Sequence, residues 1–204
     1  MHAIEVERKR RLPGTETGAV AARLAALGFH RKGAFVEVDT YYSRPDADYL
    51  ETVECLRVRQ RDGFAEITYK PASTSATHRR DGIIAKPETN VILADAHQAE
   101  AANQLLAVVG MTPLARVEKS RTLYRHPDRD DVTISLDAIT DVGVFVETEV
   151  IATDTIEAAT CLEDLERQLG FTILPVVSSP YRDLVLQHAS HVPSSTVPGV
   201  LPSA

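Results

Sequence analysis

The chain contains 204 residues, of which 44% are hydrophobic and 25% are charged, and it carries a formal net charge of −7. This length and composition fit one globular domain with a sizeable core, and the negative charge argues against a general nucleic-acid binder, which needs a basic surface. No secretory signal and no apolar run long enough to cross a membrane is present, so we expect a soluble, cytoplasmic protein that does not bind membranes.

The first predicted element is a strand over residues 3–11 that separates charged from apolar side chains. Because side chains alternate between the two faces of a strand, Glu5, Glu7 and Lys9 share one face, and Val6 lies on the other. In a single strand, this pattern is also typical of a sheet with one face in solvent. It becomes informative because later strands repeat it.

Seven further strands are predicted along the chain, from alternating β-branched and charged residues with turn signals between them. They cover residues 35–43, 54–61, 64–70, 83–93, 114–125, 132–139 and 144–151. Three predicted helices have apolar residues at helical spacing and end near a glycine, over residues 17–27, 95–109 and 155–169. A shorter fourth helix is predicted from about Pro180 to His188.

Eight strands with few helices indicate a mainly β fold of the α+β class. We predict an eight-stranded antiparallel β-barrel, or a strongly curved sheet, with the helices packed outside. The fourth helix, which begins near Tyr181, is expected to cover the barrel. Residues 1–188 are expected to form this single domain and residues 189–204 a disordered tail.

The charged alternation of the first strand recurs, and the sign of the charge differs between strands. The middle strands carry the bases Arg57, Arg59, Lys70, Lys86, Lys119 and Arg121, and the last strands carry the acids Asp137, Glu147 and Glu149. A solvated surface normally mixes both signs. Sorted signs therefore favour an interior where bases contact an anion and acids bind the cations that accompany it.

The chemistry of this interior follows from the cost of buried charge. If the apolar strand faces pack against helices, the charged faces point into the barrel, which must then contain water and ions. Carboxylate ligands favour the hard cations Mg²⁺ or Mn²⁺, and the lack of clustered His and Cys argues against zinc. Cys55 and Cys161 are predicted to be ordinary reduced thiols.

The polar segment 71–82 has two interpretations. It is either a surface loop that only connects strands, or a mobile lid that delivers Arg79 or Arg80 to a ligand.

Together these motifs resemble the CYTH family, also called triphosphate tunnel metalloenzymes, over roughly residues 3–187. The Glu-x-Glu-x-Lys signature of the family is matched by Glu5, Glu7 and Lys9. The further matches are Leu56-Arg57-Val58-Arg59, Thr68-Tyr69-Lys70, Lys119-Ser120-Arg121 with Tyr124, Leu136-Asp137, and Gly143-Val144-Phe145-Val146-Glu147-Thr148-Glu149. The order and number of motifs make this resemblance more specific than the signature alone.

One segment departs from the family pattern, which carries Arg-x-Glu-x-Glu in a middle strand. Here the sequence is Lys86-Pro87-Glu88-Thr89-Asn90, so an amide replaces one acid and a proline enters the strand. Proline cannot donate to a strand ladder and suits an edge or a bulge. The geometry of this wall is therefore open, and it bears on substrate choice.

The resemblance implies an eight-stranded tunnel that binds triphosphates with a divalent metal. It implies that Glu147 and Glu149, with Asp137, hold the substrate-bound metal. Glu5 and Glu7 would hold a second metal and, with Lys9 beside the reacting phosphate, form the catalytic group. The side chains that would bind the phosphates are Arg57, Arg59, Lys70, Lys86, Lys119 and Arg121.

The resemblance leaves the reaction open. A class IV adenylyl cyclase converts a nucleoside triphosphate to a cyclic nucleotide and pyrophosphate, whereas a triphosphatase hydrolyses an inorganic or organic triphosphate. The C-terminal motifs are most similar to the cyclase branch, which is our first hypothesis, with a triphosphatase second. A non-catalytic module that binds polyphosphate or nucleotide is the third, and the oligomeric state, including a homodimer, also stays open.

Overall fold

The computed structural model describes residues 4–191. Its strands are β1 (Ile4–Leu12), β2 (His30–Ser43), β3 (Cys55–Arg61), β4 (Phe64–Lys70), β5 (Ile84–Pro87), β6 (Thr89–Ile92), β7 (Thr112–His126), β8 (Arg129–Ile139) and β9 (Gly143–Ala152). Its helices are α1 (Thr17–Ala26), α2 (Gln98–Val108), α3 (Thr155–Gln168) and α4 (Tyr181–His191), with the short 3₁₀ helices η1 (Gly14–Glu16) and η2 (Phe171–Ile173). None of the helices within residues 4–191 has the length and hydropathy needed to cross a membrane.

The predicted tail overlaps the last helix. Helix α4 continues to His191, so the first three residues of the predicted tail are helical. Residues 192–204 lie outside the described residues.

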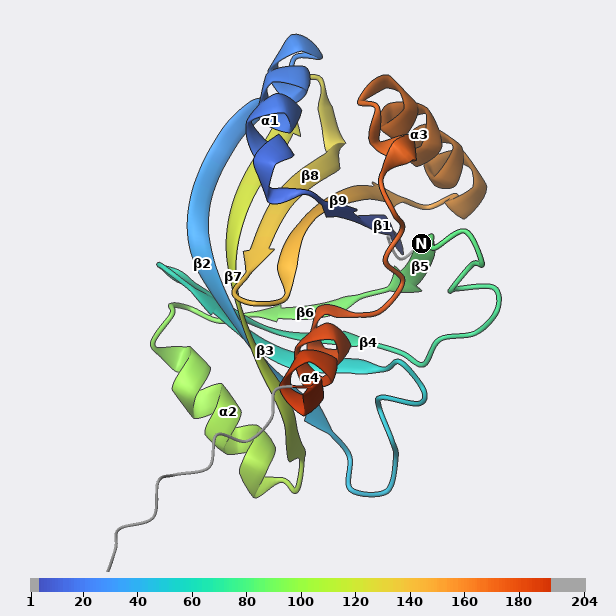
Figure 1. The fold of residues 1–204 in the computed structure, drawn as a ribbon. Coiled ribbons are helices and arrows are strands. Elements are labelled where there is room, and N and C mark those ends of the chain that lie inside the picture. Colours follow the sequence, from blue (N-terminus) through green and yellow to red (C-terminus); the bar gives the residue numbers. More distant parts are fainter. Residues whose placement is uncertain (1–3, 192–204) are drawn as a thin grey trace, which may run out of the picture.

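All nine strands belong to one antiparallel sheet, in the order β5-β1-β9-β8-β7-β2-β3-β4-β6. The two end strands, β5 and β6, are separated in the sequence only by Glu88. Because β5 pairs with β1 and β6 pairs with β4, this segment joins the two edges of the sheet and curls it into a nearly closed barrel (Figure 1). The predicted antiparallel barrel is confirmed.

The strand predicted over residues 83–93 is two strands in the structure, which changes the number of strands from the predicted eight to nine. Pro87 is the last residue of β5, where it pairs in register with Ile4. Proline has no N–H to donate to a ladder. The chain therefore leaves β1 at this point, and after Glu88 it pairs with β4 instead.

Three helices cover the outside of the barrel (Figure 1). Leu24 of α1 and Leu162 of α3 are fully buried in one apolar cluster with Val6 of β1 and Ile134 of β8. Burial of each such side chain contributes about 1.5–3 kcal/mol. Helix α2 packs in the same way against β3 and β4, where Ala99 is buried.

The outer face of β1 is less apolar than we predicted. Arg8 and Arg10 both point to α3, are only 6% exposed, and donate to the carboxylate of Glu166, which is 1% exposed. Arg10 also donates to the carbonyl of Leu174 over 2.7 Å. Two buried guanidinium groups thus share one carboxylate, which fixes the position of α3 on the barrel.

Helix α4 differs from the other three because it packs against inward-facing side chains. Tyr181 and Leu184 form an apolar cluster with Tyr41 of β2, Val117 of β7 and Phe145 of β9. These three strand residues are in phase with the charged residues of the barrel interior. The first turns of α4 therefore cover one end of the barrel, as the sequence predicted.

Candidate functional site

The barrel interior contains a cavity of about 760 Å³, measured with its open mouth. All the predicted site residues except Asp137 line it: Glu5, Glu7, Lys9, Arg57, Arg59, Lys70, Lys86, Lys119, Arg121, Glu147 and Glu149. The remaining lining side chains come from Val53, Glu54 and Cys55 before and at the start of β3, from Tyr41 and Ile84, and from Pro180, Tyr181 and Arg182 at the start of α4. The charged faces of the strands therefore point inward.

Strand register places the acidic residues of β1 and β9 together. Glu7 lies directly opposite Glu149, and Lys9 lies directly opposite Glu147. Like charges at such positions repel each other. Burial, and then the charges of Glu5 and Glu7, raise the pKa of Glu149 well above its ordinary value.

The oxygen-only donors on this wall fit a hard divalent cation, which would relieve the repulsion around Glu149. The ligands are not yet arranged as a set, since no three His, Cys, Asp or Glu side chains within residues 4–191 are placed to hold a metal ion. Two of the carboxylates are instead bound to bases. Glu5 pairs with Lys70, and Glu147 accepts a hydrogen bond from Arg121 over 2.7 Å.

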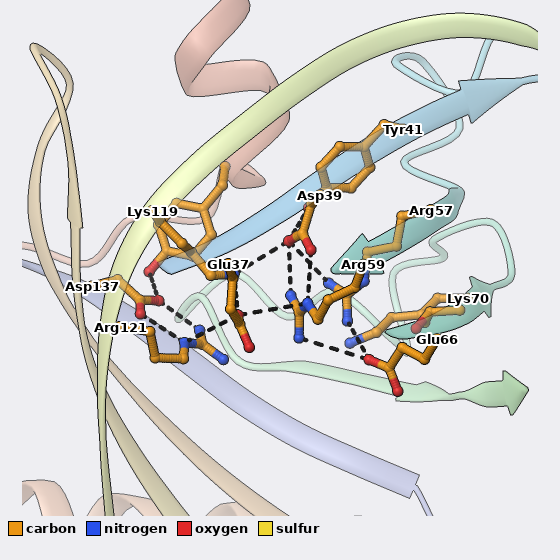
Figure 2. Close-up of polar contacts among 12 residues, drawn as sticks. Glu37, Asp39, Tyr41, Arg57, Arg59, Glu66, Lys70, Lys119, Arg121 and Asp137 are labelled. Atoms are coloured by element: carbon orange, nitrogen blue, oxygen red, sulfur yellow. Dashed lines mark hydrogen bonds and ion pairs between the residues drawn. The ribbon is translucent and has the colours of Figure 1, made fainter. Parts of the chain in front are cut away.

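Three acids inside the barrel were missed by the sequence reasoning. Asp39 accepts two hydrogen bonds from Arg59, over 2.7 and 2.8 Å, and Glu37 and Asp39 both lie within 3.3 Å of Lys119 Nζ (Figure 2). Glu66 lies 3.9 Å from Arg59. The sequence signal was present, because Glu37 and Asp39 alternate in β2 as Glu5 and Glu7 do in β1.

These acids neutralise much of the basic wall. Burial alone would raise the pKa of Asp39, but the charges of Arg59 and Lys119 outweigh it and hold this pKa well below its ordinary value. The carboxylate of Asp39 is therefore ionised at neutral pH. Arg59 and Lys119 are thus already paired before any anion enters the cavity.

Arg57 is the arginine with the loosest contacts in this cluster. Its nearest carboxylate is Glu88 at 3.6 Å, and those of Asp39 and Glu66 lie at 4.0 Å. Its Nε is buried and has no hydrogen-bond partner among the described residues. Arg57 also lines the cavity, so its guanidinium group can approach an anion there.

Asp137 lies behind the cavity wall and is fully buried. Its carboxylate accepts hydrogen bonds from Arg121 over 2.7 and 2.5 Å (Figure 2). It also accepts one from the hydroxyl of Tyr181 over 2.8 Å. Burial opposes ionisation, but Arg121 outweighs it and lowers the pKa of Asp137 to about 2. In this structure Asp137 therefore anchors Arg121, and its predicted role as a metal ligand stays a prediction.

Two of the lysines that line the cavity lack a carboxylate partner within ion-pair distance, among the residues that the structure describes. The Nζ of Lys86 donates to the carbonyl of Val53 over 2.7 Å. Burial, and then the charge of Lys70, lower the pKa of Lys86 from 10.5 to about 8. Val53 has a φ of 55°, a left-handed conformation that β-branched residues rarely adopt. The Nζ of Lys9 lies 4.1 Å from the ring centre of Tyr181.

The segment 71–82 does not bring an arginine to this cavity. Arg79 pairs with Asp81 over 2.6 Å and approaches Glu163 of α3 at 3.8 Å, on the outside of the barrel. Neither Arg79 nor Arg80 lines the cavity. The structure thus matches the interpretation as a surface loop.

Known proteins share this architecture. A family model described as "CYTH domain" matches residues 3–173. A Methanocaldococcus jannaschii protein named "Putative adenylate cyclase MJ0240" is 29% identical over 163 residues, which cover 79% of this chain and 85% of that protein.

Solved structures match the fold. The PH1819 protein of Pyrococcus horikoshii is 23% identical, with a TM-score of 0.74 and coverage of 90% of this chain and 98% of that one. The Hippeastrum protein described as "Putative adenylyl cyclase HpAC1", with a dominant triphosphatase activity, is 16% identical, with a TM-score of 0.62 and coverage of 92% and 97%. At these identities the structural matches support the fold alone.

Proposed function

The chain belongs to the CYTH domain family, and we propose that it is a metal-dependent enzyme that processes triphosphates. The observation that carries this proposal is the cavity itself, where bases of β3, β4 and β7 face carboxylates of β1 and β9. A phosphate chain with bound divalent cations is the ligand whose charges match both walls.

The basic wall is proposed to bind the phosphates. Arg57 lines the cavity and has only long contacts to carboxylates, so it offers charge-assisted hydrogen bonds to phosphate oxygens. Arg59, Lys70, Lys119 and Arg121 would add positive charge. The remaining proposed phosphate ligand is Lys86.

The acidic wall is proposed to bind the metal. Glu147 and Glu149 would hold one Mg²⁺ or Mn²⁺ ion, and Glu5 and Glu7 a second. Such an ion supplies polarisation of the phosphate oxygens. The pairing of Arg59 and Lys119 with Asp39 supports this requirement, because a wall that is partly neutralised attracts a free polyanion weakly and its metal complex better.

The proposed reaction is that of a class IV adenylyl cyclase, in which the cavity orients a nucleoside triphosphate so that it forms a cyclic nucleotide and pyrophosphate. The name of the Methanocaldococcus relative and the C-terminal sequence motifs support it. The second candidate is a triphosphatase, the activity described for the Hippeastrum protein that shares the fold. In both reactions the chain would act by orienting groups and by stabilising charge.

Product identification tests the proposal. The purified protein is incubated with ATP or tripolyphosphate, in Mg²⁺ or Mn²⁺, and the products are separated by chromatography. Cyclic AMP and pyrophosphate from ATP support the cyclase, and orthophosphate from either substrate supports the triphosphatase. Tight binding without turnover under both metals would overturn the enzyme and leave the non-catalytic module, and the absence of binding would overturn the proposal as a whole.

A further inference from the structure

Tyr181 connects helix α4 to the interior of the barrel. It is the first residue of α4, is 6% exposed and lines the cavity. Its ring packs edge to face against Phe145 at 5.3 Å, and its hydroxyl donates to Asp137. The side chain is therefore fixed at both the ring and the hydroxyl.

The ring of Tyr181 also contacts the Lys9 ammonium. Lys9 Nζ lies 4.1 Å from the ring centre, within the range of a cation–π contact. No carboxylate among residues 4–191 pairs with Lys9, although Glu147 lies directly opposite it on β9. The carboxylate of Glu147 is bound instead by Arg121.

This arrangement keeps two opposite charges apart. If Lys9 paired with Glu147, the ammonium would no longer be available to bind the phosphates, and the carboxylate would no longer be available to bind the metal. The aromatic face attracts the ammonium without neutralising it, because a ring has no net charge. Lys9 is therefore a nearly buried side chain, 8% exposed, that lines the cavity and forms no ion pair among the described residues.

We propose that Tyr181 is a positioning residue, whose ring holds Lys9 toward the phosphate chain and away from Glu147, and whose hydroxyl holds Asp137 and thereby Arg121. This inference rests on the proposed function, since it assigns a role within the same site. It makes α4 a part of the binding site as well as a cover for the barrel end.

The test compares the ring with the hydroxyl. Steady-state kcat and KM are measured with tripolyphosphate or ATP, whichever the wild type turns over, in Mg²⁺. Tyr181→Leu removes the ring and should lower kcat/KM by about tenfold to thirtyfold, the effect of a desolvated cation–π contact. Tyr181→Phe keeps the ring and should restore kcat to within about threefold of the wild type, with KM raised because Asp137 loses one donor.

A double-mutant cycle separates positioning from packing. Lys9→Met should lower kcat/KM, and adding Tyr181→Leu to it should cause a smaller further loss than Tyr181→Leu causes alone, because the ring lies 4.1 Å from Lys9 Nζ and the rest of its effect comes from Lys119 Nζ at 5.2 Å. Tyr181→Leu combined with Arg57→Ala should instead show additive losses. Additive losses with Lys9→Met as well, or a Tyr181→Phe variant as impaired as Tyr181→Leu, would overturn the proposal.

Leu184→Ala is the packing control, because Leu184 is on the same helix and packs in the same cluster but does not line the cavity. It should lower the melting temperature, and its effect on kcat/KM should add to that of Lys9→Met. Non-additivity in this control equal to that of Tyr181→Leu would reduce Tyr181 to a packing role.

A wild type without metal-dependent binding or turnover would contradict the proposed function itself, whereas an active wild type with an equally active Tyr181→Leu variant would contradict only this inference.

Discussion

The carboxylate of Glu147 belongs to the acidic wall of the cavity but contacts a residue of the basic wall. It accepts a hydrogen bond from Arg121 and lies opposite Lys9 in the β1–β9 register. In the proposed function it exchanges this pairing for a metal ion. Its charge should therefore matter more than its shape.

Glu147→Gln keeps the shape and removes the charge. We expect metal-dependent turnover of the triphosphate to fall at least about a hundredfold, since loss of even outer-shell partners of metal ligands costs about 10–100-fold. The measurement is turnover as a function of Mg²⁺ concentration. Glu118→Gln is the control, because Glu118 is 58% exposed and pairs with Arg116 away from the cavity. Full activity of Glu147→Gln would refute the metal assignment.

Lys86 gives the site a dependence on pH. Its ammonium loses its proton as the pH rises through about 8, because burial lowers its pKa from 10.5. The attraction for phosphate is present below this pH and is lost above it. The value of kcat/KM, which reports the free enzyme, should therefore fall as the pH rises above about 8.

Lys86→Arg is the matched variant for this prediction, because a guanidinium group stays charged throughout this range. It should reduce the fall in kcat/KM between pH 8 and 10, measured at a constant concentration of free Mg²⁺. Any fall that remains is expected from Lys9 and Lys119, because burial lowers their pKa as well. The same fall in both proteins would assign the titration to another group.

At the scale of single elements, the contact between β1 and α3 combines the expected apolar packing with buried charge. Alternation correctly placed Glu5, Glu7 and Lys9 in the barrel. The opposite face of the same strand carries Arg8 and Arg10, which are buried because both donate to the carboxylate of Glu166 of α3. The sequence separation between these partners hides the pairing from any local pattern.

Glu166→Ala should destabilise the protein strongly. Loss of one partner of a buried ion pair costs about 3–5 kcal/mol, because the remaining charge is left buried without compensation. Here two guanidinium groups would be left. The free energy of unfolding is measured by urea denaturation.

Glu163→Ala on the same helix is the control. Glu163 is 41% exposed and its only ion-pair contact among the described residues, with Arg79, is 3.8 Å long, so its loss should cost less than about 1 kcal/mol. Equal effects of the two substitutions would contradict a special role for Glu166.

At the scale of the whole molecule, the barrel brings opposite walls together through strands that are distant in the sequence. Ligand that bridges these walls should stabilise the entire fold, because it binds only the folded chain. At a concentration of 100 times its Kd, such a ligand contributes about 2.7 kcal/mol. For a protein of this size, that corresponds to a rise in melting temperature of about 5–10 °C.

We expect this rise with tripolyphosphate and Mg²⁺ together, and a much smaller one with tripolyphosphate in EDTA. The reason is that Asp39, Glu37 and Glu66 already offset the bases that would bind a metal-free polyanion. Thermal unfolding monitored by circular dichroism provides the measurement. An equal rise in EDTA would contradict the need for metal.

The sequence by itself determined most of the strands, the strand faces that line the cavity, and the family. These features depend on short-range alternation, as in Glu5-x-Glu7-x-Lys9, and on the order of motifs along the chain. The break after Pro87 was also visible as a departure from the family pattern, although its result, two strands in place of one, was not.

Only the tertiary structure decided which charges meet. Arg59 is neutralised by Asp39, Arg121 by Asp137, and Lys9 lies on the ring of Tyr181, a residue from the far end of the chain. Such pairings depend on barrel register and on the docking of α4. Because the energy of a buried charge is set by the groups within a few ångströms of it, its state follows from closure of the barrel and not from its neighbours in the sequence.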